Sequence, residues 1–172
     1  MLFESREVVK LQEIYSYLIL KLKCISKTIK CPFFFAILGL NSLRYLDLSF
    51  NHLSKVGSMA LGRLPSLVGL RLDHNSIVEV TPGSFSGLPS LETLIINKNG
   101  IRKVEAETVS RLPSLEKVQM SENLIEALED NAFHDLHALK ELHLDRNLIG
   151  ELGSHAIVDT PSIRWLSILR TF

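Results

Sequence analysis

The sequence lacks the motifs that mark most enzymes. It contains no G-x-S-x-G nucleophile motif, no glycine-rich phosphate-binding loop and no H-E-x-x-H metal motif. Its longest apolar runs, Tyr17–Leu20 and Pro32–Leu40, are far shorter than the ~20 residues that a membrane-spanning helix needs. We therefore predict a chain that is not an enzyme, binds no cofactor and has no membrane span.

The sequence also lacks net charge and export signals. Lysine plus arginine (19) equals aspartate plus glutamate (19), so no overall field attracts nucleic acid, which we do not expect as a partner. Glu4 and Glu7 stand where a secretory signal is basic, and no Asn-x-Ser/Thr acceptor occurs, so no signal peptide is recognisable. Cys24 and Cys31 are the only cysteines; they could form a disulfide bridge, or Cys24 could be a free buried thiol.

A 24-residue period dominates the rest of the chain. The pattern L-x-x-L-x-L-x-x-N-x-L, with other aliphatic residues at some leucine positions, begins at Leu43, Leu67, Leu91, Leu115 and Leu139. Each repeat then places further apolar residues at fixed positions, and several repeats end in a Leu-Pro-Ser-Leu junction. A fixed repeat of this length indicates a solenoid, in which each turn buries its apolar face only against its neighbours.

Each column of the repeat has a physical role. Side chains alternate along a strand, so the aliphatic positions of the pattern point into the core and the residues between them point outward. The asparagine amide can bind the backbone groups where the strand bends into the loop. We predict an α/β right-handed solenoid, a horseshoe with a parallel β-sheet on its concave face and irregular or short helical convex segments.

The repeat frame divides the chain into segments of different regularity. Apolar residues at helical spacing near the start predict a helical cap, and Lys27 in the asparagine position marks a degenerate repeat. The predicted segments are 1–18, the N-terminal cap; 19–42, the degenerate repeat; 43–162, the five full repeats; and 163–172, a truncated repeat.

These repeats resemble the typical leucine-rich repeats of animal extracellular proteins, the class found in Slit, chaoptin, Toll-like receptors and small leucine-rich proteoglycans. The resemblance covers residues 43–168 well and 19–42 loosely. It implies recognition of a macromolecule on the concave face and a place in an extracellular or cell-surface protein, such as a receptor or adhesion molecule. Members of this class usually begin with a cap of four cysteines, which this chain does not have.

Strand alternation selects the candidate partner-binding residues. The outward columns of the predicted sheet combine aromatic, charged and histidine side chains, a mixture that suits a protein ligand. The predicted partner-binding residues are Tyr45, Asp47, Phe50, Arg71, Asp73, His74, Lys98, Glu122, His143, Asp145, Arg146 and Trp165. Each aromatic could instead shield an irregular end of the solenoid, since single exposed apolar residues are common.

Two alternatives concern chemistry and assembly. His143 with Asp145, and Arg71 with Asp73, share a strand face, but a metal site needs three or four ligands, so we predict none. We predict a non-catalytic protein-binding module. The alternative is a structural or matrix protein. In that case copies of the chain would self-associate through an uncapped end around Trp165.

Overall fold

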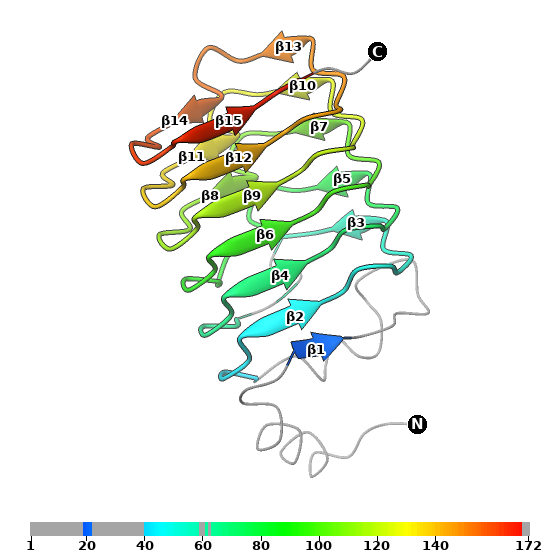
Figure 1. Cartoon of the computed structure of the whole chain (residues 1–172), viewed down its shortest axis with the longest axis vertical. Helices are drawn as coiled ribbons and strands as arrows, with labels where there is room; N and C mark the ends of the chain where they lie inside the picture. Colours follow the sequence, from blue (N-terminus) through cyan, green and yellow to red (C-terminus); the bar gives the residue numbers. More distant parts are fainter. Residues whose placement is uncertain (1–18, 22–39, 59–60, 62, 170–172) are drawn as a thin grey trace.

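Each 24-residue repeat forms one coil of the chain, and the coils stack into a solenoid. The computed structural model describes residues 19–21, 40–58, 61 and 63–169. Figure 1 shows the coils stacked from β1 at one end of the molecule to β15 at the other. One long parallel sheet lines one side of the stack, and short strands lie across from it (Figure 1).

The long sheet contains seven strands, each contributed by a different coil. In spatial order they are β1 (Ile19–Lys21), β2 (Tyr45–Asp47), β4 (Gly69–Arg71), β6 (Thr93–Ile95), β9 (Lys117–Gln119), β12 (Glu141–His143) and β15 (Trp165–Ser167). From β2 onward every paired residue lies 24 positions from its partner, as in Tyr45 with Gly69. This confirms the predicted solenoid with a parallel sheet on its concave face.

The other side of each coil consists of turns and two-residue strands in the part of the chain that the structure describes. These strands form three small parallel sheets. They are β3 (Lys55–Val56) with β5 (Glu79–Val80); β7 (Lys103–Val104), β10 (Ala127–Leu128) and β13 (Glu151–Leu152); and β8 (Val109–Ser110), β11 (Phe133–His134) and β14 (Ile157–Val158). Of the two alternatives for the convex segments, the irregular one therefore applies to the described residues.

The core fills the space between the long sheet and the short strands. The aliphatic columns of the repeat are almost completely buried, as at Leu70, Leu94, Val118 and Leu142 in the long sheet. Among the described residues, Phe133 on β11 is the largest side chain that is fully buried. Burial of a side chain of this kind contributes about 1.5–3 kcal/mol, so the repeated columns supply the main stabilisation of the stack.

The repeated asparagines form a ladder between coils, as the sequence predicts. Asn99 Nδ2 donates to the carbonyl oxygen of Ile96 in its own coil (3.2 Å) and to that of Leu72 in the preceding coil (3.0 Å). Its Oδ1 accepts from the Ile77 amide (3.0 Å). Asn75, Asn123 and Asn147 repeat these contacts. Each asparagine therefore joins two coils, and its Oδ1 is the acceptor for an amide of the preceding coil.

The residue before each asparagine has a left-handed backbone. Phe50, His74, Lys98, Glu122 and Arg146 have φ angles of 53° to 56°, a region that costs a non-glycine residue about 1–2 kcal/mol. The amide of each donates to the next coil, as Phe50 does to the carbonyl of Asp73 (3.0 Å). The same conformation recurs in the convex turns, so the coil geometry itself requires it.

The first strand departs from the 24-residue frame. That frame would place Lys21 beside Tyr45, but Ile19 is the residue that pairs with Tyr45, so β1 is offset by two positions from the predicted degenerate repeat. The predicted helical cap of residues 1–18, and both Cys24 and Cys31, lie outside the described residues. The segment boundaries drawn from the sequence stay a prediction.

Candidate functional site

The concave face of the long sheet brings the predicted partner-binding residues together. All of them lie on the strands β2, β4, β12 and β15 or directly after a strand of this sheet. The exposed members fall into an aromatic group on the first coils and a charged group on the later coils. The exposed fraction of each residue distinguishes those that a partner could contact from those whose side chains bind other groups of the solenoid.

The aromatic group lies at the β2 end of the face. Tyr45 is 43% exposed and Phe50 is 61% exposed. The Phe50 ring stacks on His74 of the next coil, with ring centroids 4.2 Å apart and the planes inclined by 17°. Trp165, 59% exposed, stands at the other edge of the sheet on β15. The concave face therefore presents aromatic surface to solvent on the coil of β2, next to the first strand, and on the last strand, β15.

Asp73 is the centre of a polar cluster rather than an exposed ligand group. Its carboxylate is only 4% exposed and accepts from Arg71 through Nε (3.1 Å) and Nη2 (3.2 Å). His74 Nδ1 lies 2.9 Å from the same carboxylate. Burial alone raises the pKa of Asp73, but the hydrogen bonds with Arg71 and His74 outweigh burial and leave this pKa below its usual value. The hydrogen bond with Asp73 in turn raises the pKa of Arg71.

The other two predicted aspartates also bind groups of the fold. Asp47 is 8% exposed and accepts from the Ser49 amide (2.9 Å). Asp145 accepts from the Leu169 amide (3.1 Å) and from the Ser167 hydroxyl, and these bonds outweigh burial and lower its pKa. All three aspartates lie on the predicted face, but their carboxylates are used within the solenoid.

The charged group occupies the coils that follow. Glu122 forms ion pairs with Lys98 (3.9 Å) in the coil before it and with Arg146 (3.5 Å) in the coil after it. Glu141 contacts Lys117 (2.6 Å) in the neighbouring strand. Exposed pairs of this kind contribute little to stability, so their charges can be shared with a partner at small cost.

Two members of this group are not among the residues predicted from the sequence, and His143 joins it through Glu141. Lys117 and Glu141 were not among the predicted residues, although their opposite charges one repeat apart in one column were a readable signal. His143, which shares a strand face with Asp145, has its Nε2 3.2 Å from Glu141. The hydrogen bond from Lys117, followed by that from His143, lowers the pKa of Glu141.

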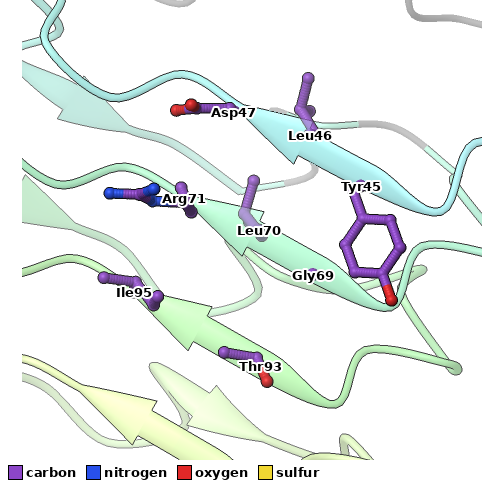
Figure 2. Close-up of a pocket in the computed structure, with 8 residues that line it drawn as sticks. All are labelled: Tyr45, Leu46, Asp47, Gly69, Leu70, Arg71, Thr93 and Ile95. Carbon is purple, nitrogen blue, oxygen red and sulfur yellow. The ribbon is translucent and has the colours of Figure 1, made fainter. Parts of the chain in front are cut away.

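A hollow opens in the concave face between the aromatic and charged groups. It has a volume of about 270 Å³ and is lined by Tyr45, Leu46, Asp47, Gly69, Leu70, Arg71, Thr93 and Ile95. Figure 2 shows the Tyr45 ring extending from β2 toward Gly69 on β4, with Thr93 and Ile95 on the next strand. Gly69 is the only glycine of its column and is not among the residues predicted from the sequence.

The convex wall also carries ion pairs between adjacent coils. Lys55 with Glu79 (2.5 Å), and Arg102 with Glu126 (3.2 Å), pair across adjacent coils. Within the described residues, no group of three or more histidine, cysteine, aspartate or glutamate side chains could hold a metal ion. None of the described residues belongs to a helix that is long and apolar enough to cross a membrane.

Solved structures with the same architecture include two that cover nearly all of this chain. The structure of the TLR13–ssRNA13 complex aligns with a TM-score of 0.62 and 21% identity, over 96% of this chain and 26% of that one. The leucine-rich repeat domain of APL1B aligns with a TM-score of 0.54 and 18% identity, over 98% of this chain and 60% of that one. The chain thus spans only part of these proteins, and at this identity the likeness shows the fold alone.

The repeats themselves carry the family assignment. No curated protein matches the chain. The family model described as "Leucine rich repeat" matches residues 35–77, 65–125 and 113–170, which together extend over most of the chain. Those stretches contain the stacked coils, the asparagine ladder and the concave sheet described above. The chain therefore belongs to the leucine-rich-repeat family.

Proposed function

We propose that this chain is a non-catalytic module that binds a protein ligand through its concave face. The observation that carries the proposal is the exposure of Tyr45, Phe50 and Trp165 on one sheet face, beside the cations Lys98 and Arg146. Aromatic and arginine side chains supply most of the binding energy in protein interfaces. The strands are spaced about 4.8 Å apart, so the sheet offers the width of one side of a standard interface.

We further propose that the module is part of an extracellular or cell-surface protein with a receptor or adhesion role. The support is the resemblance of its 24-residue repeats to those of animal extracellular proteins. The proposal predicts that screening the chain against an array of secreted and cell-surface ectodomains returns a specific partner. An array without any binder, alongside a partner recovered among intracellular proteins, would contradict this assignment.

Charge reversal tests the concave face with that partner. We expect Lys98→Glu combined with Arg146→Glu to weaken binding at least about tenfold, because both cations are exposed and only loosely paired. The matched control reverses Arg63 and Arg111, which are exposed outside the long sheet. Equal losses in the two double variants would reject the concave face as the binding surface. Arg71 is unsuitable for this test, because reversing its charge would oppose the buried Asp73.

A second candidate function, a structural protein that assembles through its β15 end, is favoured by the apolar residues there. Leu166 is 48% exposed, whereas Leu142, its partner on β12, is completely buried. Light scattering over a dilution series tests this candidate. Assembly that depends on concentration and is lost on Trp165→Lys, but retained on Tyr45→Lys, would support it, and a strictly monomeric chain would reject it.

A further inference from the structure

The hollow beside Gly69 exists because one strand lacks a side chain where its neighbours have one. Tyr45 and Thr93 flank Gly69 in the same column of the sheet. A Cβ atom at this position would lie 2.8 Å from Cδ1 of Tyr45, so the aromatic ring occupies space that any other residue would fill. The glycine therefore allows the ring to lie close to β4 and leaves the rest of the space open (Figure 2).

The size of the hollow limits what can occupy it. Pockets for drug-sized ligands measure about 300–1,000 Å³ and enclose most of the ligand. At about 270 Å³, and open along the concave face, this hollow suits one large side chain rather than a complete small molecule. Its walls include the Tyr45 ring and the side chains of Thr93 and Ile95, so that side chain is apolar over most of its surface.

The charged residues at the rim of the hollow favour an uncharged side chain inside it. The Arg71 guanidinium is held by two hydrogen bonds to Asp73, so its charge is already compensated within the fold. About half of the Arg71 side chain is nevertheless exposed, and this side chain lines the hollow. A guanidinium fixed in this way stacks favourably on an aromatic face, and a second aromatic ring packs favourably on Tyr45. An aliphatic side chain would gain burial but neither of these contacts.

We propose that the hollow between β2, β4 and β6 receives an aromatic side chain from the protein partner. The proposal rests on the proposed binding function and specifies its anchor: an uncharged segment of the partner that exposes phenylalanine, tyrosine or tryptophan. Gly69 is a specificity-determining residue in this arrangement, because it leaves the space open. Tyr45 and Arg71 supply the surfaces that distinguish an aromatic from an aliphatic side chain.

A displayed library of random linear peptides tests this without knowledge of the natural partner. Peptides are selected on the wild-type chain and then measured against Gly69→Leu, which fills the hollow, and Gln119→Leu, which adds the same side chain on β9 outside it. We expect the selected peptides to share an aromatic residue. Their binding should fall at least about tenfold on Gly69→Leu, or when that residue becomes leucine, and stay unchanged on Gln119→Leu.

The other outcomes separate the anchor from the proposed function. Peptides that bind Gly69→Leu normally but lose binding on Lys98→Glu with Arg146→Glu would reject the anchor and retain the concave face. Peptides without a shared aromatic residue, peptides rich in acids that depend on Arg71, or a library without binders would also reject the anchor. Tyr45→Ala, at an exposed position, provides an independent variant should Gly69→Leu unfold, and its expected loss is again about tenfold.

Discussion

Removal of one asparagine from the ladder should destabilise the solenoid by an amount that its hydrogen bonds determine. Asn123 is buried and donates to the carbonyl oxygens of Ile96 and Met120, both at 3.0 Å, while its Oδ1 accepts from the Ile101 amide at 3.3 Å. The two carbonyls keep a second donor, Asn99 Nδ2 and Asn147 Nδ2 respectively. Asn123→Ala therefore leaves the buried Ile101 amide without its side-chain acceptor, whereas both carbonyl oxygens remain hydrogen-bonded.

The expected loss of stability follows from the number of hydrogen bonds that Asn123→Ala removes. A buried amide without a partner costs about 1–3 kcal/mol, and each weakened carbonyl contact adds about 0.5 kcal/mol. We expect Asn123→Ala to lower the free energy of unfolding by about 3 kcal/mol. Asn41→Ala, at an exposed turn residue, should change it by less than about 0.5 kcal/mol. Urea denaturation followed by circular dichroism measures both, with the slope of the transition checked for constancy.

Asn123→Asp separates the donor role of the side chain from its acceptor role. The carboxylate keeps an acceptor for the Ile101 amide, but it places an oxygen against the Ile96 and Met120 carbonyls. This environment raises the pKa of the introduced carboxyl in the folded state, so stability should be recovered as the pH falls and lost as it rises. A cost below about 1 kcal/mol for Asn123→Ala would refute the reasoning. So would an Asn123→Asp variant that is equally stable relative to wild type at pH 7 and pH 4.

Three further predictions concern single buried groups. Thr108 Oγ is buried without a hydrogen-bond partner among the described residues, and the next coil has Ala132 at this position, so Thr108→Ala should raise the free energy of unfolding by about 1 kcal/mol in urea denaturation. Asp73 has a lowered pKa in the folded state, so its contribution is present above about pH 4 and lost as the pH falls through that lowered value. Asp73→Asn should therefore be less stable at pH 7 and should lose less stability on acidification, as urea midpoints between pH 7 and pH 3 will show. Phe133→Ala should cost about 3–5 kcal/mol and lower the midpoint of thermal unfolding, whereas Phe50→Ala should have a far smaller effect because its ring is exposed.

The sequence predicts the coil well because its period determines which side chains face inward. The aliphatic columns and the asparagines recur with the 24-residue period, and the sheet register follows that spacing from β2 to β15. The register of β1 could not be predicted in this way, because the asparagine position there holds Lys27 and the frame has lost its marker. Ile19, rather than Lys21, pairs with Tyr45, an offset of two residues that the repeat pattern does not predict.

The candidate site could be predicted only in part. Strand alternation places side chains on the concave face, but it does not say which of them are covered by neighbouring coils. Asp73 points outward in the pattern and is nevertheless buried, because Arg71 and His74 fold over it. The hollow depends on a glycine next to the tyrosine of another strand, and such contacts between repeats become visible only when the coils are stacked.

The constant register also determines how the concave face responds to changes in chain length. Because neighbouring strands pair residues 24 positions apart, loss of residues 75–98 would join His74 to Asn99 and leave the repeat pattern unbroken. Strand β4 would then pair with β9, so that Lys117 would replace Thr93 beside Gly69. A change of length by one whole repeat would thus exchange residues of the concave face while each remaining coil still stacks on a coil of the same register. Length variation in multiples of one repeat therefore changes the residues of the concave face without breaking the stacking of the coils.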